Sequence, residues 1–189
     1  MSPPVKPAMK FPFAVEQGYH MGTVNHWGPT FSVSFDLKIN KKSSQYSGVF
    51  HMVNKDRDTN AGAEGAYKPA VFINANSSSL RIICNQYSFN TDELPLAAWN
   101  NIRMSTGYCS EGNLYFKAYV NGVVVYKYKI HHPTHFHKME VFAGSPTEPA
   151  AMADIDNFSI SGAISMNFIL KVKCEHHVSE LDHKLKKPL

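Results

Sequence analysis

The segment Phe31-Ser32-Val33-Ser34-Phe35-Asp36-Leu37-Lys38-Ile39 alternates large apolar residues with small or charged ones. Successive side chains of a β-strand point to opposite faces of its sheet, so this period of two predicts a strand with one buried face and one wet face. It is the longest such segment in the chain. We therefore expect a β protein that is built outward from residues 31–39.

Short apolar runs of the same kind recur along the chain and are separated by turn-forming residues. The strongest turn is Asn121-Gly122, because both residues accept the positive φ angles of a type I′ turn, and it predicts a hairpin. Helical periodicity is confined to one short candidate at 179–186. Many strands without intervening helices indicate an all-β fold, an antiparallel sandwich of two sheets. The expected strands are 31–39, 49–53, 70–73, 80–84, 99–104, 114–120, 123–130, 139–143, 155–160 and 164–172.

The length of 189 residues fits a single domain with short appendages. Three prolines among the first ten residues indicate an N-terminal arm over 1–12, the sandwich occupies 13–162, and 163–189 form an extra strand and a C-terminal tail. No apolar segment follows the first charges, so no signal peptide is visible. No apolar run reaches the roughly 20 residues of a membrane helix.

Charge and cysteine content exclude several classes of protein. The net charge of +4 is spread along the chain, whereas a nucleic-acid-binding protein concentrates its cations in a stripe. The three cysteines, Cys84, Cys109 and Cys174, are too few for a disulfide framework and form no Cys-x-x-Cys pair. We expect no nucleic-acid partner.

Four segments occur in a distinctive order: Trp27-Gly28-Pro29, Trp99-Asn100-Asn101-Ile102-Arg103, Tyr119-Val120-Asn121-Gly122 and Ile155-Asp156-Asn157-Phe158. This order, over about residues 13–161, resembles the laminin-G-like modules of the concanavalin A-like lectin and glucanase superfamily. The resemblance implies a jelly-roll sandwich that works outside the cell and binds glycans or protein surfaces. We expect Trp99 to lie in the core, since large aromatic residues dominate sandwich cores.

Two other branches of that superfamily can be compared with the sequence. Its glucanases carry three acids in a Glu-x-Asp-x-Glu strand, two of them serving as nucleophile and acid/base, and no such triplet occurs here. No Gly-x-Ser-x-Gly motif is present either, so we expect no enzymatic activity and no required cofactor. Residues 50–57 resemble the sugar-binding strand of galectins through His51, Asn54 and Arg57. Asn54 stands one residue out of register, which turns its side chain to the other face.

A glycan-binding surface on this fold combines a stacking aromatic ring with short amides that bind hydroxyls. Side chains of these kinds cluster around the middle strands. The candidate ligand-binding residues are His51, Asn54, Arg57, Tyr67, Asn74, Asn85 and Tyr87.

Two groups of residues have the chemistry of metal ligands. Asp56, Asp58 and Asn60 alternate and are followed by Glu64, which is similar to a calcium loop, although the glycine falls one place late. A polar surface loop explains the same residues. The second group is His131, His132, His135 and His137, whose imidazoles suit zinc or copper.

The leading hypothesis from the sequence is a non-enzymatic binding module for a carbohydrate or a protein surface, assisted by calcium at the 56–64 loop. One alternative is a structural protein that assembles into a homo-oligomer, with residues 163–189 adding a strand to a neighbour's sheet. A further alternative is a metal-binding protein that uses the histidine cluster.

Overall fold

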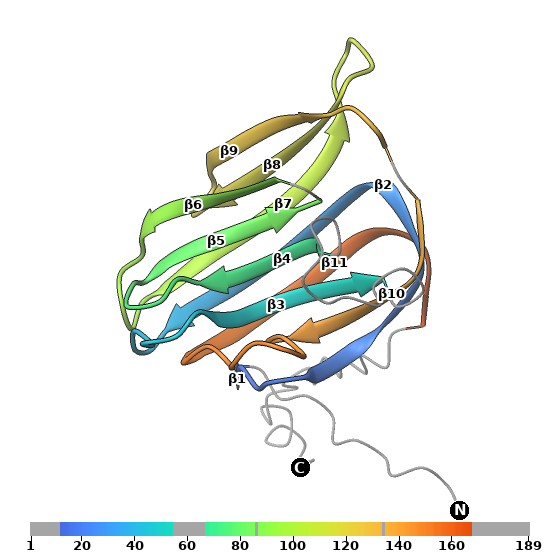
Figure 1. Ribbon diagram of the computed structural model, residues 1–189. Helices are drawn as coiled ribbons and strands as arrows, with labels where there is room; N and C mark the ends of the chain where they lie inside the picture. Colours follow the sequence, from blue (N-terminus) through green and yellow to red (C-terminus); the bar gives the residue numbers. More distant parts are fainter. Residues whose placement is uncertain (1–11, 55–66, 86, 134, 168–189) are drawn as a thin grey trace, which may run out of the picture.

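The computed structural model describes residues 12–54, 67–85, 87–133 and 135–167, which form strands joined by turns (Figure 1). These ranges contain no helix, and therefore none long and apolar enough to cross a membrane. Neighbouring strands all pair antiparallel, which confirms the all-β antiparallel fold predicted from the alternation. The strands are β1 (Phe13–Ala14), β2 (Tyr19–Ile39), β3 (Ser47–Asn54), β4 (Tyr67–Ile73), β5 (Ser79–Cys84), β6 (Tyr87–Glu93), β7 (Trp99–Tyr108), β8 (Leu114–Val120), β9 (Val123–Ile130), β10 (Phe136–Ala143) and β11 (Ala153–Asn167).

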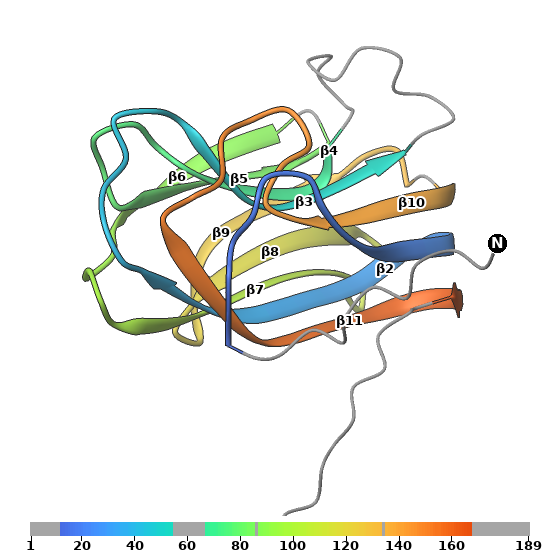
Figure 2. The same cartoon turned by 90° about the horizontal axis from the view of Figure 1, so that it is seen from below.

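The long strand β2 joins the two layers of the sandwich. Its first half, up to Trp27, pairs with β10, and its second half, from Phe31, pairs with β7. One layer therefore runs β6-β5-β4-β3-β10-β2 and the other runs β2-β7-β8-β9, with β11 beside β2. Figure 2 shows the two layers edge on. This is a jelly-roll sandwich, as predicted.

The change of layer in β2 occurs at Gly28-Pro29-Thr30. Pro29 has no N–H to donate to a neighbouring strand, which suits a position between two pairings. The hydroxyl of Thr106 in β7 donates to the carbonyl oxygen of Pro29 at 2.6 Å and accepts from the backbone N–H of Phe31 at 2.9 Å. Gly162 of β11 lies against the same bend at a φ of +96°, where a Cβ atom would meet the carbonyl oxygen of Thr30. The bend is therefore held from both sides.

The opposite side of the sandwich, between β6 and β9, closes through side chains. The ring centroids of Phe89 and Tyr126 lie 4.3 Å apart, and those of Tyr87 and Tyr128 lie 4.4 Å apart. The hydroxyl of Tyr128 donates to the carbonyl oxygen of Cys84 at 2.8 Å. Burial raises the pKa of Tyr128 well above its usual range, so this hydroxyl remains a donor.

The core consists of the inward side chains of both layers, and the apolar residues of 31–39 are buried in it as predicted. Trp99 is not part of it. Its side chain is 43% exposed, and the Lys38 ammonium lies 4.9 Å from its ring centroid. The prediction that Trp99 is a core residue is wrong because the inward positions of β7 include Ile102 and Met104, and Trp99 stands an odd number of residues away.

The strand β11 continues through residues 163–167. There it pairs with the first half of β2 in the same chain, for example Met166 with Val24. The assembly alternative expected residues 163–189 to add a strand to a neighbour's sheet. Residues 163–167 pair along one edge with β2 of their own chain, and residues 168–189 lie outside the described residues.

Candidate functional site

The outer face of β7, β8 and β9 carries a shallow hollow of about 170 Å³. Its lining comes from all three strands and from the start of the turn after β7. The side chains that give the hollow its chemistry are Ser105, Tyr108, Tyr115, Lys117, Tyr119 and Lys127. The half-buried Cys109 also reaches the lining. Tyr108 is 55% exposed, which leaves much of its ring open to solvent.

Strand register places these side chains together. Ser105 of β7 stands opposite Lys117 of β8, and Lys117 stands opposite Lys127 of β9. The three residues form one row across three strands. Two residues along β8 in either direction lie Tyr115 and Tyr119, on the same face because side chains alternate along a strand.

A β-bulge decides which side chains of β9 reach this face. Val124 and Tyr126 pair with the consecutive residues Tyr119 and Ala118, which leaves Val125 as an extra residue in β9. An extra residue reverses the face of every residue that follows it. The tyrosines of β9 therefore point into the sandwich and its lysines point outward.

Two cations on this face are packed against aromatic rings. The guanidinium carbon of Arg103 lies 3.9 Å from the ring centroid of Tyr119, and the ammonium of Lys127 lies 4.4 Å from that of Tyr115. Such contacts are worth about 0.5–1 kcal/mol at exposed sites. They reduce the freedom of two long side chains and hold their charges beside the hollow.

The outer face of the other layer is covered at the middle of β3 and β4, although Arg81 of the neighbouring β5 is exposed. His51 and Phe72 point away from the core, yet each is only 1% exposed. The His51 ring contacts Phe72, and Tyr46 stacks on Phe72 with centroids 4.8 Å apart. The Nδ1 atom of His51 and the Oγ atom of the buried Ser145 lie 3.3 Å apart. Burial lowers the pKa of His51 to about 4, so the imidazole is neutral near pH 7.

The structure does not bring the predicted ligand-binding residues together on one open surface. His51 and Asn54 are both buried in β3. Asn85 adopts a positive φ of 57° at the turn after β5, and Tyr87 packs on Tyr128. Tyr67 begins β4 opposite Val53, but its side chain and the whole of Arg57 lie outside the described residues.

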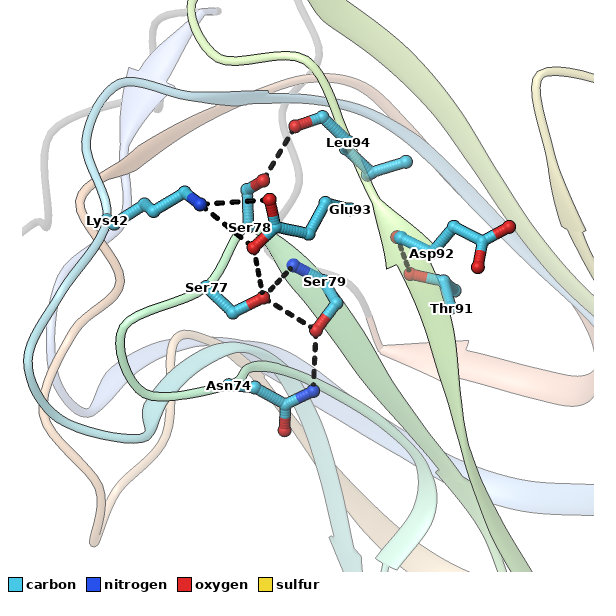
Figure 3. Close-up of polar contacts among 9 residues, drawn as sticks. All are labelled: Lys42, Asn74, Ser77, Ser78, Ser79, Thr91, Asp92, Glu93 and Leu94. Carbon is cyan, nitrogen blue, oxygen red and sulfur yellow. Dashed lines mark hydrogen bonds and ion pairs between the residues drawn. The ribbon is translucent and has the colours of Figure 1, made fainter.

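Asn74 belongs to a polar network at the ends of β4, β5 and β6 (Figure 3). Its amide nitrogen donates to Ser79 Oγ at 2.9 Å and to Asn90 Oδ1 at 3.1 Å. Nearby, Ser77 and Lys42 donate to the Glu93 carboxylate, and these hydrogen bonds hold the pKa of Glu93 below its usual value. The contacts of Asn74 order this turn, which is a structural role.

The predicted metal sites remain predictions. Asp56, Asp58, Asn60 and Glu64 lie outside the described residues. His131, His132 and His135 are exposed between β9 and β10, and the side chain of His137 is not described. Within the part of the chain that the structure describes, no three His, Cys, Asp or Glu side chains gather as metal ligands.

Arg103, Tyr108, Lys117 and Lys127 were not singled out by the sequence. The alternation of Tyr115, Lys117 and Tyr119 was a usable signal, since it marks a wet strand face that carries both rings and a charge. The bulge at Val125 decides which face of the sheet Lys127 occupies, and no residue pattern in the sequence predicts that bulge.

No protein-family model matches the sequence, and no curated protein matches it. Similar folds were found among solved structures. Domain 4 of AbnA, a GH43 extracellular arabinanase from Geobacillus stearothermophilus, in complex with arabinotriose, is 15% identical with a TM-score of 0.51 over 80% of this chain and 71% of that one. Trypanosoma rangeli sialidase in complex with sialic acid is 11% identical with a TM-score of 0.54, over 71% of this chain and 21% of the sialidase.

The PL7 alginate lyase AlyA1 from Zobellia galactanivorans is 14% identical with a TM-score of 0.45, over 72% of this chain and 64% of the lyase. This chain therefore spans less than two thirds of the lyase and about a fifth of the sialidase. At these identities the likenesses show the fold alone, and neighbours of this chain are jelly-rolls of the concanavalin A-like type. The narrower resemblance to laminin-G-like modules stays a prediction.

The comparisons correct the predicted function. A non-enzymatic binding module for carbohydrate or protein, with calcium, was inferred from the fold, but polysaccharide lyases are among the similar structures. The inference from this fold to a module without chemistry is therefore wrong.

Proposed function

We propose that this chain is a carbohydrate-active protein and that it engages a polysaccharide at the hollow on β7, β8 and β9. One observation carries the proposal: an open hollow of about 170 Å³ combines three tyrosines with a serine hydroxyl and two lysines. Glycan sites need an apolar ring face for the C–H side of a sugar and polar groups for its hydroxyls. Both kinds of group are present here on adjacent strands.

Tyr108 is the aromatic residue assigned to stacking. Tyr115 and Tyr119 each have a cation against the ring, whereas Tyr108, which stands opposite Leu114 at the end of β7, is 55% exposed and lines the hollow. Ser105, Lys117 and Lys127 line the hollow, and their hydroxyl and amines supply donors for sugar oxygens. Because the site is built on three paired strands, these groups are fixed in relation to one another.

The named ligands of the similar structures support a carbohydrate partner. AbnA domain 4 was solved with arabinotriose and the sialidase with sialic acid. These titles describe those proteins, and the identities of 11–15% mean that no binding residue is transferred from them. The residues assigned to the glycan here come from the hollow alone.

The test is a titration of the whole chain with arabinotriose, sialic acid and oligogalacturonate, followed by calorimetry, with the same mixtures assayed for cleavage products. We expect at least one saccharide to bind or to be cleaved. The substitution Tyr108→Ala should weaken binding about three- to tenfold, the range of one aromatic contact. Trp99→Ala is the matched control, since Trp99 is an exposed aromatic residue of the same strand outside the hollow.

Two results would overturn the proposal. One is that none of the saccharides binds or is cleaved. The other is that Trp99→Ala and Tyr108→Ala weaken binding equally. A glycan bound in the hollow should contact Tyr108 and not Trp99.

A further inference from the structure

The row Ser105–Lys117–Lys127 places two like charges directly opposite each other. Lys117 and Lys127 are cross-strand partners in β8 and β9, both on the outer face. Like charges in this position destabilise a sheet. The register that creates the pair depends on the bulge at Val125. A cross-strand pair of this kind is relieved when an anion lies between the two ammonium groups.

The whole surface of these three strands is positive. β7, β8 and β9 contain no Asp or Glu, and four cations, Arg103, Lys117, Lys127 and Lys129, stand at outward positions. The ion pairs that join Lys38 to Asp154 and Lys42 to Glu93 lie elsewhere. None of the four cations is neutralised by either pair.

Acidic residues on the strands of this layer lie at its other end, and Glu111 is in the turn between β7 and β8. Asp36 of β2 accepts from Asn101 and Asn157, and Asp154 of β11 pairs with Lys38. The face is therefore polarised from acidic at β11 and β2 to basic at β8 and β9. This charge distribution gives a neutral ligand no electrostatic gain in affinity. It attracts a polyanion to the basic end, at β8 and β9.

We infer that the glycan is a linear polyanionic polysaccharide, carboxylated or sulfated, and that it crosses the strands along the basic end of this face. This inference rests on the proposed function and names the substrate class of the same hollow. Lys117 and Lys127 bind one acidic group between them, with the Ser105 hydroxyl in the same row. Arg103 and Lys129 are diagonal neighbours of Lys117, about 7–8 Å away on either side, and take acidic groups farther along the chain.

The cation–aromatic contacts fit this role. Arg103 and Lys127 are held against Tyr119 and Tyr115, so two of the four charges are ordered before a ligand arrives. Ordering in advance lowers the entropy that binding would otherwise cost. Charge-assisted hydrogen bonds to carboxylate or sulfate are about twice as strong as neutral ones.

The decisive variant is the double substitution Lys117→Gln and Lys127→Gln, which removes both charges and keeps a polar, unbranched side chain one atom shorter. Its matched control is Lys41→Gln with Lys138→Gln, two exposed lysines outside the hollow that give the same change in net charge. Lys117→Arg with Lys127→Arg keeps both charges and should retain binding. The probes are oligogalacturonate, its fully methyl-esterified form, dextran sulfate and inorganic polyphosphate.

We expect oligogalacturonate or dextran sulfate to bind at least about tenfold more tightly than the neutral ester. The Lys117→Gln/Lys127→Gln variant should lose that advantage, while the control and the arginine variants keep it. Preference for oligogalacturonate identifies a carboxylated glycan and preference for dextran sulfate identifies a sulfated one. Because the substitution removes a repulsive pair together with the Lys127–Tyr115 contact, the free energy of unfolding should change little, and urea denaturation checks that the variant is folded.

Three outcomes would overturn the inference. Equal affinity for oligogalacturonate and its neutral ester, with binding still lost in Tyr108→Ala, would refute the polyanion and leave the proposed function standing. Polyphosphate binding as tight as that of either acidic glycan would show unspecific attraction to anions. Absence of binding or cleavage with every saccharide would refute the inference and the proposed function together.

Discussion

The two outer faces of the sandwich differ in what covers them. On β7, β8 and β9 the outward side chains are lysines, tyrosines and Arg103, and they border an open hollow. On the other layer the outward residues His51 and Phe72 are each 1% exposed beneath Tyr46 and Ser145. Both faces arise from the same alternation along their strands. The difference comes from the segments before β3 and after β10, which fold over one face and not the other.

This contrast separates two uses of an outward position. A covered outward residue acts as a second small core, and its chemistry serves stability. An open outward residue is free to meet a ligand, and its substitution should leave the fold intact. Each prediction below tests this distinction.

The largest expected effect is on stability at the covered face. Phe72→Ala should lower the free energy of unfolding by about 3–5 kcal/mol, as for other buried phenylalanines, because its ring packs against Tyr46 and His51. Lys117→Ala on the open face should change it by less than about 0.5 kcal/mol. Urea denaturation of both variants measures the difference. Losses of equal size would show that the two faces are not distinct.

The next effect is a pH dependence that only the covered face should show. Folded His51 stays neutral down to a pKa of about 4, whereas in the unfolded chain it takes up a proton near its ordinary value of 6.5. Between these values the unfolded state binds more protons, so the free energy of unfolding falls as the pH is lowered from about 7 to 4, by up to about 3 kcal/mol.

The His51→Gln variant isolates this contribution. Its stability should fall less steeply over the same range, while carboxylates such as Glu93 titrate alike in both proteins. Denaturation curves at several pH values between 7 and 4 provide the comparison. Identical slopes for the variant and the parent would contradict the assignment to His51.

The smallest effect is expected at Trp99. This residue lies on the same layer as the hollow, and 43% of its side chain is exposed. Trp99→Ala should therefore lower the free energy of unfolding by less than about 1 kcal/mol. The buried Trp27 is the matched control, and Trp27→Ala should cost about 3–5 kcal/mol. A large loss of stability in Trp99→Ala would contradict the distinction between the two faces, because it would show that the contact of Trp99 with Lys38 stabilises the fold.

Much of the fold was predictable from residue alternation and turn chemistry. The Asn121-Gly122 hairpin is confirmed, with φ angles of 50° and 81° at the turn and Val120 paired with Val123. The strand β6 was missed because its apolar residues are few, and the first half of β2 was missed because residues 19–30 lack the clean alternation of 31–39. Two predicted strands, 155–160 and 164–172, belong to the single strand β11, at least as far as residue 167.

The candidate site was less predictable than the fold. His51, Asn74 and Tyr87 have the chemistry of ligand-binding residues, but each is engaged by neighbours that are distant in sequence or on another strand. Burial and partnership of this kind depend on which strands become neighbours. The resemblance of residues 50–57 to a sugar-binding strand does not indicate which strands will lie beside it.

The sequence by itself determined the strands, the hairpin and the side chains that alternate along β8, because steric preferences of the backbone and the period of two are local. Only the tertiary structure decided the face of Lys127. The tyrosines of β9 pack inward against Phe89, Tyr87 and Phe116, and this packing goes with an extra residue at Val125 that turns the lysines outward. Contacts between β6 and β9, far apart in the chain, thus place Lys127 opposite Lys117 and complete the basic face.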